Sequence, residues 1–293
     1  MQSQTSSQNN RSTFTLTTTC LGENGVAVPV TAMLGLETPT STSITGSVGY
    51  SIWPTMYAPL FSFLPMDVPR KTDCVVQGKK WPNLISIGLR NELRKPDKTG
   101  SSLPYNWQTW YEQIKPAADI VNAANPNILI FLSGLDYDTK LTPIPTGDDL
   151  GGGKKFRLSD FSYKDKLVLE LHNYQNSAKK CSDIEGGLWD NGFRATYPDV
   201  ANRMPVVLTE FGFTQADKSY NGVYATCLHS LMVKWKTGWM VWALGGSYYI
   251  RGGTQDYEET WGLLNHQWSD WRNKDAISAL KGMVDDTLKS VRR

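Results

Sequence analysis

Short apolar segments alternate with helix-length segments along most of this 293-residue chain, and this alternation constrains the fold more than any other feature. The apolar segments cover residues 84–89, 128–132, 166–171, 205–211 and 237–244. Helical patterns follow over residues 107–122, 222–236 and 275–288. Strands that alternate with helices are typical of βα units around a parallel sheet. The length allows one α/β barrel or two smaller domains.

Polar side chains share one face of two of these predicted strands. In residues 85–92 the apolar side chains take the odd positions, and the even positions carry Ser86, Gly88, Arg90 and Glu92. In residues 167–172 leucines alternate with Val168, Glu170 and His172. Polar groups are costly against packed helices, but they can be satisfied at the centre of a barrel or cleft. We therefore expect both strands to present polar chemistry inward.

Two glutamates lie where a predicted strand ends. Glu92 follows the first predicted strand, and Glu210 lies near the end of the fourth. Two carboxylates held apart by a rigid scaffold are the minimum equipment for cleaving a glycosidic bond, one as acid/base and one as nucleophile. A structural ion pair between Glu92 and the flanking Arg90 or Arg94 is the plainer alternative.

Four short motifs follow one another along the chain: RNEL at residues 90–93, His172-Asn173-Tyr174, TEFG at residues 209–212, and Trp242. Their order and spacing resemble glycoside hydrolase family 5, whose cellulase-like members are retaining enzymes on a (β/α)8 TIM barrel. The resemblance covers the C-terminal three-quarters of the chain. It places the motifs on the fourth, sixth, seventh and eighth barrel strands. Leu93, where the family more often has proline, resembles a branch of plant and fungal members.

The resemblance implies a role for each motif residue. Glu92 would be the acid/base, Glu210 the nucleophile, and Asn91 a ligand of the sugar 2-hydroxyl. His172 and Tyr174 would orient the two glutamates and the bound sugar. Trp242 would form the floor beneath the sugar.

The first part of the chain departs from the family pattern. Family members usually carry an arginine on the second strand and a histidine on the third. Here no histidine precedes His172, and only Arg11 and Arg70 precede Arg90. The simplest hypothesis is that another segment replaces the family's N-terminal strands, through truncation, exon loss or a faulty gene model.

We therefore expect an incomplete (β/α)8 TIM barrel. Residues 76–293 would form the barrel part with about five clear βα units, and residues 1–75 an atypical, Ser/Thr-rich segment. Residues 13–19 and 26–36 are candidate strands within that segment. An open five-stranded sheet exposes two edges and apolar inner surface. The product would be poorly stable unless residues 1–66 fill the gap.

Two functions remain open at this point. The first is a retaining hydrolase that cleaves O-glycosidic bonds of a β-linked polysaccharide or oligosaccharide. The second is a catalytically inactive, truncated relative that at most binds carbohydrate. A Ser/His/Asp hydrolase is disfavoured because no GxSxG motif occurs.

Composition and spacing argue against several other sites and partners. The 30 Lys and Arg nearly balance the 28 Asp and Glu, and basic residues form only short pairs, which disfavours nucleic acid. Four cysteines and three histidines are scattered without zinc-ligand spacing, and no phosphate-binding glycine loop occurs. We expect no metal and no cofactor.

The remaining expectations concern location and assembly. The uncharged residues 38–66 are interrupted by Ser, Thr, Gly and Pro, so we expect no membrane span. The N-terminus lacks the apolar core of a secretory signal, although the resemblance implies a secreted enzyme. We expect a monomer with a carbohydrate substrate. The pairing of Cys20, Cys74, Cys181 and Cys227 stays open.

Overall fold

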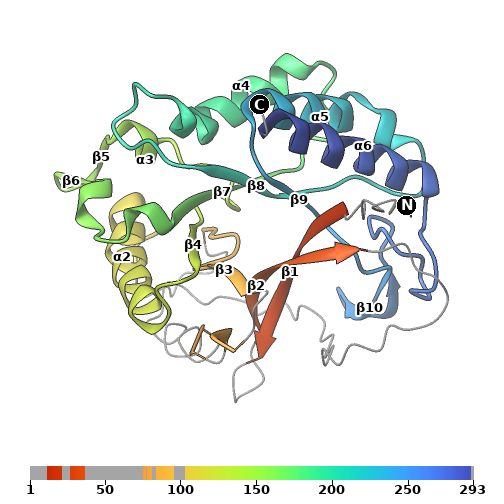
Figure 1. Cartoon of the computed structure of the whole chain (residues 1–293), viewed down its shortest axis with the longest axis horizontal. Coiled ribbons are helices and arrows are strands. Elements are labelled where there is room, and N and C mark those ends of the chain that lie inside the picture. The colour runs from red at the N-terminus through yellow and green to blue at the C-terminus, as the bar shows by residue number, and fades with distance from the viewer. Residues whose placement is uncertain are drawn as a thin grey trace, which may run out of the picture.

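The computed structural model describes residues 12–21, 27–36, 75–76, 78–80, 84–95 and 103–291, with side chains described from residue 75 onward. Its main feature is one curled seven-stranded sheet in the order β1-β2-β3-β4-β7-β8-β9 (Figure 1). The five strands from β3 to β9 are parallel. They are β3 (Leu84–Gly88), β4 (Leu129–Leu132), β7 (Leu167–Asn173), β8 (Val206–Phe211) and β9 (Trp239–Val241). All five lie where the apolar segments predicted them.

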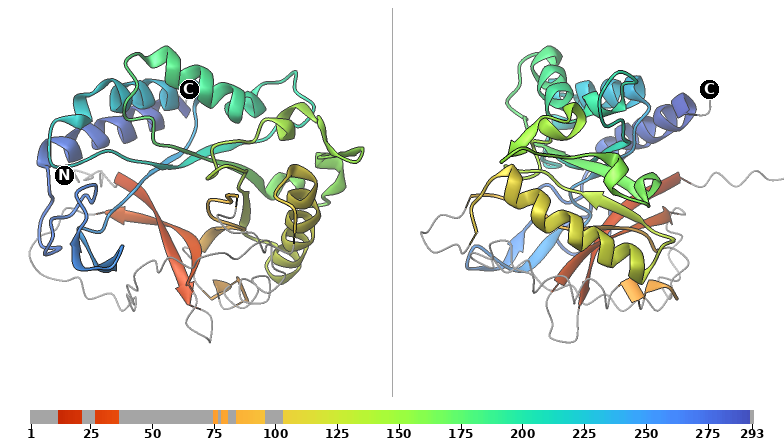
Figure 2. Two further views of the ribbon diagram at one scale, coloured as in Figure 1. Left: turned by 180° about the vertical axis from the view of Figure 1, so that it is seen from behind. Right: turned by 90° about the vertical axis from the view of Figure 1, so that its left-hand side faces the viewer.

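Helices lie on the outer side of this sheet (Figures 1 and 2). The longer ones are α2 (Trp107–Ala124), α4 (Cys181–Asn191), α5 (Val223–Trp235) and α6 (Lys274–Val291). The sequence predicted three of them, and α4 is the addition. Asn106 begins α2 because its side chain accepts a hydrogen bond from the Thr109 backbone N–H at 2.8 Å. Strands and helices thus form an incomplete (β/α)8 barrel, as expected.

The two strands that the sequence predicted near the N-terminus are also present. They are β1 (Ser12–Leu21) and β2 (Ala27–Leu36), which pair antiparallel with each other. Only residues 22–26 connect them, too few for the crossover that parallel strands need. β2 also pairs antiparallel with β3. Cα atoms of β1 come within 8 Å of those of β9, so the sheet curls nearly onto itself.

The two faces of the parallel strands bury different side chains. The face toward the helices carries the large core, with Ile130, Leu169 and Leu208 fully buried. The inner face carries a small separate cluster of Phe131, Val168 and Met240. Residues 168 and 169 therefore point to opposite sides, as the alternation predicted. Burying each such aliphatic side chain stabilises the fold by roughly 1.5–3 kcal/mol.

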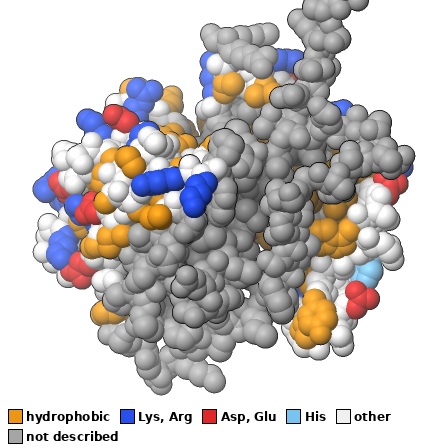
Figure 3. All heavy atoms as spheres, turned by 60° about the horizontal axis from the view of Figure 1, so that its bottom comes forward, with side chains coloured by type: hydrophobic (Ala, Val, Ile, Leu, Met, Phe, Trp, Pro, Cys, Tyr) orange, Lys and Arg blue, Asp and Glu red, His pale blue; other side chains and the backbone are white. Residues whose placement is uncertain are grey.

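Shorter elements complete the described chain. They are α3 (Pro143–Thr146), β5 (Asp149–Gly151), β6 (Lys154–Lys155), β10 (Ser247–Arg251), β11 (Thr254–Glu258) and four 3₁₀ turns at Leu158–Asp160, Lys164–Lys166, Phe193–Thr196 and Ser219–Asn221. None of the described helices is long and apolar enough to cross a membrane. On the described surface in Figure 3, acidic and basic side chains are interspersed. The division of the chain at residue 75 stays a prediction.

Candidate active site

Glu92 and Glu210 meet at the carboxyl ends of the parallel strands. Glu210 lies in β8, and Glu92 lies four residues beyond the end of β3. His172 in β7 is the register partner of Glu210. One carboxylate oxygen from each glutamate and one ring nitrogen of His172 all lie within 4.8 Å of one another. Strands β4 and β7 separate β3 from β8, so the curl of the sheet is what brings the two glutamates together.

Polar side chains contact both glutamates. The His172 Nδ1 atom lies 3.1 Å from the Glu92 Oε1 atom and 3.5 Å from the Glu210 Oε2 atom. The Tyr174 hydroxyl donates a hydrogen bond of 2.8 Å to the same Glu210 oxygen. The Tyr174 ring packs against Trp261, with 5.7 Å between the ring centroids. Four of the predicted residues, Glu92, His172, Tyr174 and Glu210, therefore form one cluster.

His172 is a buried cation in this cluster. Burial alone lowers the pKa of an imidazole, because a charged group loses hydration. Here the hydrogen bond with Glu92 and the negative charges of Glu210, Asp138 and Glu170 outweigh burial and raise the pKa of His172 to about 9. The ring is thus protonated on both nitrogens at neutral pH, and Nδ1 donates to Glu92.

Glu210 lies in a more buried setting than Glu92. Burial raises the pKa of Glu210, His172 lowers it, the charge of Glu92 raises it, and the hydrogen bond from Tyr174 lowers it. Burial followed by the charge of Glu210 raises the pKa of Tyr174, which keeps its hydroxyl proton for donation. His172 and Tyr174 are therefore the groups that favour an ionised Glu210.

Arg94 is a peripheral neighbour of the pair of glutamates. Arg94 approaches Glu92 from the exposed side, with 4.0 Å between its Nη1 atom and Glu92 Oε2. Its firmer contact is a hydrogen bond of 3.1 Å to the Glu92 backbone carbonyl. An ion pair of Glu92 with Arg94 is thus at the distance limit, and the Glu92 carboxylate faces His172.

Trp242 directly follows β9 and lies beside the cluster. Its backbone N–H donates to the Phe211 carbonyl at 2.8 Å, next to Glu210 in β8. A Cβ atom at Gly212 would lie 2.3 Å from the Trp242 carbonyl oxygen, so only glycine permits this approach. The Trp242 ring also contacts Trp261, with 6.4 Å between centroids.

The hairpin formed by β10 and β11 contacts the Trp242 ring through Arg251. The Arg251 guanidinium lies 5.0 Å from the Trp242 ring centroid and 4.8 Å from that of Tyr248. The Arg251 side chain also forms an ion pair with the buried Glu259. Glu259 in turn accepts a hydrogen bond of 3.0 Å from the Trp261 backbone.

Asn91 is the predicted residue that stays apart. Its side chain is exposed, and within the described part of the chain it makes no hydrogen bond to the cluster. Its place next to Glu92 in the chain leaves it at the rim of the site. A ligand in the site could reach it from there.

Sequence reasoning missed Asp138 and Trp261, which both contact the cluster. Asp138 is fully buried, and its Oδ2 atom lies 3.8 Å from the His172 Nε2 atom. It lies just beyond the carboxyl end of β4, the same kind of position that singled out Glu92. That signal was available in the sequence. Trp261 gave no local signal, because a tryptophan in a loop has no period to place it.

Glu92, His172 and Glu210 are also a described group whose atoms could converge on one metal ion. Metals bind the neutral imidazole of histidine. The raised pKa of His172 works against that form at neutral pH.

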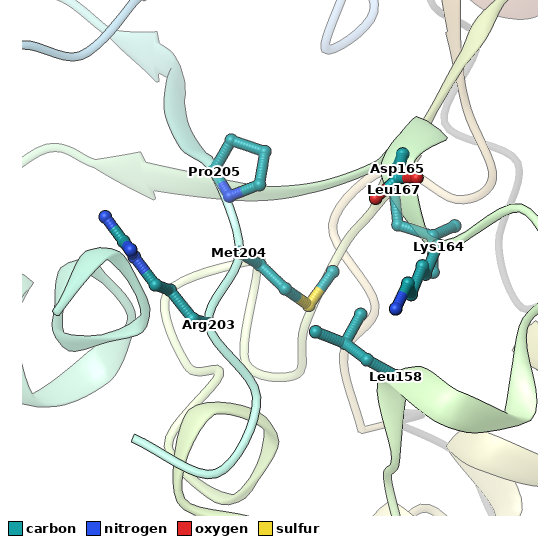
Figure 4. A pocket seen from close by; sticks show the side chains of 7 residues that line it. All are labelled: Leu158, Lys164, Asp165, Leu167, Arg203, Met204 and Pro205. Carbon is teal, nitrogen blue, oxygen red and sulfur yellow. The ribbon is translucent and has the colours of Figure 1, made fainter. Parts of the chain in front are cut away.

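A pocket occurs at the opposite end of the strands (Figure 4). It is lined by Leu158, Lys164, Asp165, Leu167, Arg203, Met204 and Pro205. Leu167 begins β7 and Pro205 immediately precedes β8, whereas His172 and Glu210 lie near the other ends of these strands. The pocket is therefore separate from the cluster.

Comparisons with known proteins agree with this geometry. The sequence model of the family described as Cellulase (glycosyl hydrolase family 5) matches residues 79–247. A "Glycosyl hydrolase 5 family protein" of Chamaecyparis obtusa is 32% identical over an alignment of 212 residues that covers 68% of this chain and 35% of that protein. The chain thus spans about a third of the length of this curated relative.

Solved structures share the fold. A hyperthermostable endocellulase aligns with a TM-score of 0.56 and 17% identity over 79% of this chain and 67% of its own. The E201A variant of an endocellulase from Pyrococcus horikoshii, in complex with cellotetraose, aligns with a TM-score of 0.55 and 15% identity over 77% of this chain and 64% of its own. At these identities the likeness concerns the fold alone.

Proposed function

This chain belongs to the cellulase family, glycoside hydrolase family 5, and we propose that it is a retaining hydrolase of β-linked polysaccharides or oligosaccharides. One observation carries the proposal: an oxygen of Glu92 and an oxygen of Glu210 lie within 4.8 Å of each other, with the His172 ring beside both. Retaining glycosidases hold their two carboxyl groups about 5–5.5 Å apart, whereas inverting ones need about 6.5–9.5 Å to admit a water molecule. The separation here supports direct attack by a carboxylate.

The first step forms a covalent glycosyl-enzyme. A Glu210 carboxylate oxygen bonds to the anomeric carbon while the bond to the leaving oxygen breaks. Glu92 gives its proton to that leaving oxygen, so the departing sugar leaves as a neutral alcohol. The second step reverses these roles: Glu92 takes a proton from water, the water oxygen bonds to the anomeric carbon, and Glu210 is released as carboxylate.

The surrounding side chains serve the two steps differently. Tyr174 and His172 stabilise the ionised form of Glu210 by a hydrogen bond and by charge. His172 also holds Glu92 Oε1, which orients the acid/base. Trp242 would support the sugar from below with its ring. Asn91, at the rim, would reach the sugar 2-hydroxyl.

The substrate class rests on chemistry and on a neighbour. Flat rings of Trp242, Trp261 and Tyr248 surround the site and suit the apolar faces of sugars. The Pyrococcus horikoshii endocellulase was solved with cellotetraose, a β-linked oligosaccharide. Cellotetraose and aryl β-cellobiosides are therefore the first substrates to assay.

The test replaces each glutamate separately by alanine. On cellotetraose, whose leaving sugar needs a proton, we expect Glu210→Ala and Glu92→Ala each to lower kcat/KM by at least about 10³-fold, the scale of losing a nucleophile or an acid/base. Azide should restore turnover of an activated aryl glycoside by Glu92→Ala, because it attacks the glycosyl-enzyme without needing a base. Glu112→Ala, on the exposed side of α2, is the matched control and should keep full activity.

Two further readings complete this test. NMR of the first product should show the β-anomer, and EDTA should leave turnover unchanged because two carboxylates and water suffice. An α-anomer as first product would overturn the retaining mechanism. A wild-type protein that binds cellotetraose without turnover would instead be the inactive carbohydrate-binding relative.

A further inference from the structure

Asp138 is a buried carboxyl group that contacts both Glu92 and His172. Its side chain has no exposed surface. The Oδ2 atom accepts a hydrogen bond of 2.7 Å from the Glu92 backbone N–H and lies 3.8 Å from the His172 Nε2 atom. The Asp138 carbonyl oxygen accepts a hydrogen bond of 3.0 Å from the His172 backbone N–H. One residue therefore joins the ends of β3, β4 and β7 beneath the site.

The backbone around these contacts is in an unfavourable conformation. Glu92 has a φ of 50°, and Asp136, Tyr137 and Asp138 have φ values of 51°, 60° and 58°. Left-handed backbone at a non-glycine residue costs about 1–3 kcal/mol and persists where surrounding contacts fix it. The hydrogen bond from Glu92 N–H to Asp138 is such a contact. A hydrogen bond from the Tyr137 N–H to the Leu93 carbonyl, at 2.9 Å, is another.

The burial of Asp138 is itself costly. Its Oδ1 atom is buried without a hydrogen-bond partner. Burial raises the pKa of Asp138, and the charge of His172 opposes that rise. A buried carboxyl group with half its hydrogen-bonding capacity unused contributes little to stability through its own contacts. Its contacts instead fix the positions of the Glu92 backbone and the His172 ring.

The position of the Asp138 carboxyl group matters because several other carboxyl groups surround His172. Carboxyl groups of Glu92 and Glu210 face its Nδ1 atom, Asp138 faces its Nε2 atom, and Glu170 also acts on its charge. Asp138 thus lies against the ring on the side away from the reacting glutamates. Without it, the pull of Glu92 and Glu210 on the ring would be less balanced.

We propose that Asp138 is a positioning residue that fixes the left-handed backbone of Glu92 and the imidazole of His172, and so aims the Glu92 carboxyl group at the leaving-group oxygen. This inference rests on the proposed hydrolysis. It predicts a defect specific to proton donation, because Glu210 keeps its own hydrogen bond from Tyr174. A misplacement of about 1 Å at a reacting group can cost about 10²-fold in rate.

The test compares leaving groups. The dinitrophenolate group of a 2,4-dinitrophenyl β-cellobioside can leave without being protonated. The sugar that leaves from cellotetraose must receive a proton. We expect Asp138→Ala to lower kcat/KM about 10- to 100-fold on cellotetraose and less than about 3-fold on the dinitrophenyl substrate. Asp138→Asn should show a smaller selective loss on cellotetraose, because its amide oxygen still accepts from the Glu92 N–H. Equal losses on both substrates would mean a structural role and would overturn the proposal.

Asp136→Asn is the matched control. Asp136 lies in the same loop, but its side chain is half-exposed and pairs with Lys140 at 2.6 Å. We expect this variant to keep the wild-type ratio of rates on the two substrates. Circular dichroism of each variant confirms that it is folded. If Asp138→Ala does not fold, the ratio of rates of Asp138→Asn on the two substrates tests the proposal.

A second measurement does not depend on turnover. NMR titration follows the imidazole of His172, which His172→Gln assigns among the three histidines of the chain. We expect the His172 midpoint to fall by about one pH unit or more in Asp138→Asn, since an opposite charge at this distance favours the cation. An unchanged midpoint would overturn the proposal even in an inactive protein. Absent wild-type turnover alone would overturn the proposed function, and the titration would still decide on Asp138.

Discussion

At the residue scale, the site is a set of acids organised around one buried cation. His172 is 3% exposed and has Glu92 and Glu210 on one side and Asp138 on the other. Three carboxyl groups this close would repel one another if all were ionised without a counter-charge. The imidazolium reduces that repulsion, and its position lets it act on both proposed reacting groups.

This arrangement makes stability depend on pH. The folded pKa of His172 is about 9 against an ordinary 6.5, so the folded protein holds a proton that the unfolded chain releases. The stabilisation that the raised pKa of His172 provides is complete below pH 6.5 and is lost as the pH rises to 9. Between pH 6.5 and 9 we expect the free energy of unfolding to fall further in the wild type than in His172→Gln. The difference between the two decreases should be at most about 3 kcal/mol. Urea denaturation at pH 6.5 and 9 measures it.

The comparison with His172→Gln isolates this one group. The raised pKa of His266, which Asp256 and Glu258 cause, contributes equally to both proteins. The raised pKa of Glu210 adds a slope of the same sign at lower pH, starting above its ordinary 4.5. Parallel curves of stability against pH for the two proteins would contradict a cationic His172.

At the element scale, a disulfide bond ties the outer helices together behind the site. Cys181 at the start of α4 is bonded to Cys227 in α5, with a sequence separation of 46. The two helices follow β7 and β8, the strands that carry His172 and Glu210. Disulfide bonds are typical of proteins from oxidising compartments.

Removing this bond should cost stability but little chemistry. A loop of this size gives about 4 kcal/mol in the chain-entropy account of disulfide bonds. We expect the double variant Cys181→Ala, Cys227→Ala to lose up to that amount in urea denaturation and to keep kcat at low temperature. Reduced wild type should match the variant, and reducing agent should leave the variant unchanged. A variant as stable as the oxidised wild type would contradict this account.

At the scale of the whole molecule, an antiparallel hairpin stands where a closed barrel would continue with βα units. β2 covers the free edge of β3, and β1 approaches β9 from the other side. The sequence predicted poor stability unless the first residues filled this gap. The hairpin meets part of that condition, because it pairs one exposed edge and brings a strand close to the other.

The hairpin's contribution can be measured by deletion. A chain without residues 1–36 leaves the edge of β3 unpaired. We expect it to unfold at lower temperature and less cooperatively than the full chain in differential scanning calorimetry. An unchanged transition would mean that the five parallel strands and their helices are sufficient for stability.

Local patterns determined much of this protein. Short apolar segments located the five parallel strands. Alternation within two of them separated the inward Glu170 and His172 from the outward leucines, because a strand's two faces meet different environments. Acidic residues at strand ends identified Glu92 and Glu210, since charge is tolerated there only with partners. The roles assigned to these residues stay predictions until the variants are measured.

Tertiary structure alone decided the remaining features. The contact of Asp138 with Glu92, the bond between Cys181 and Cys227, and the pairing of β2 with β3 each join residues far apart in the chain. No local period encodes such a contact, because it depends on how loops close and how far the sheet curls. The sequence could therefore single out Glu92 and Glu210 as the proposed reacting groups, whereas only the curled sheet could bring their oxygens within 4.8 Å.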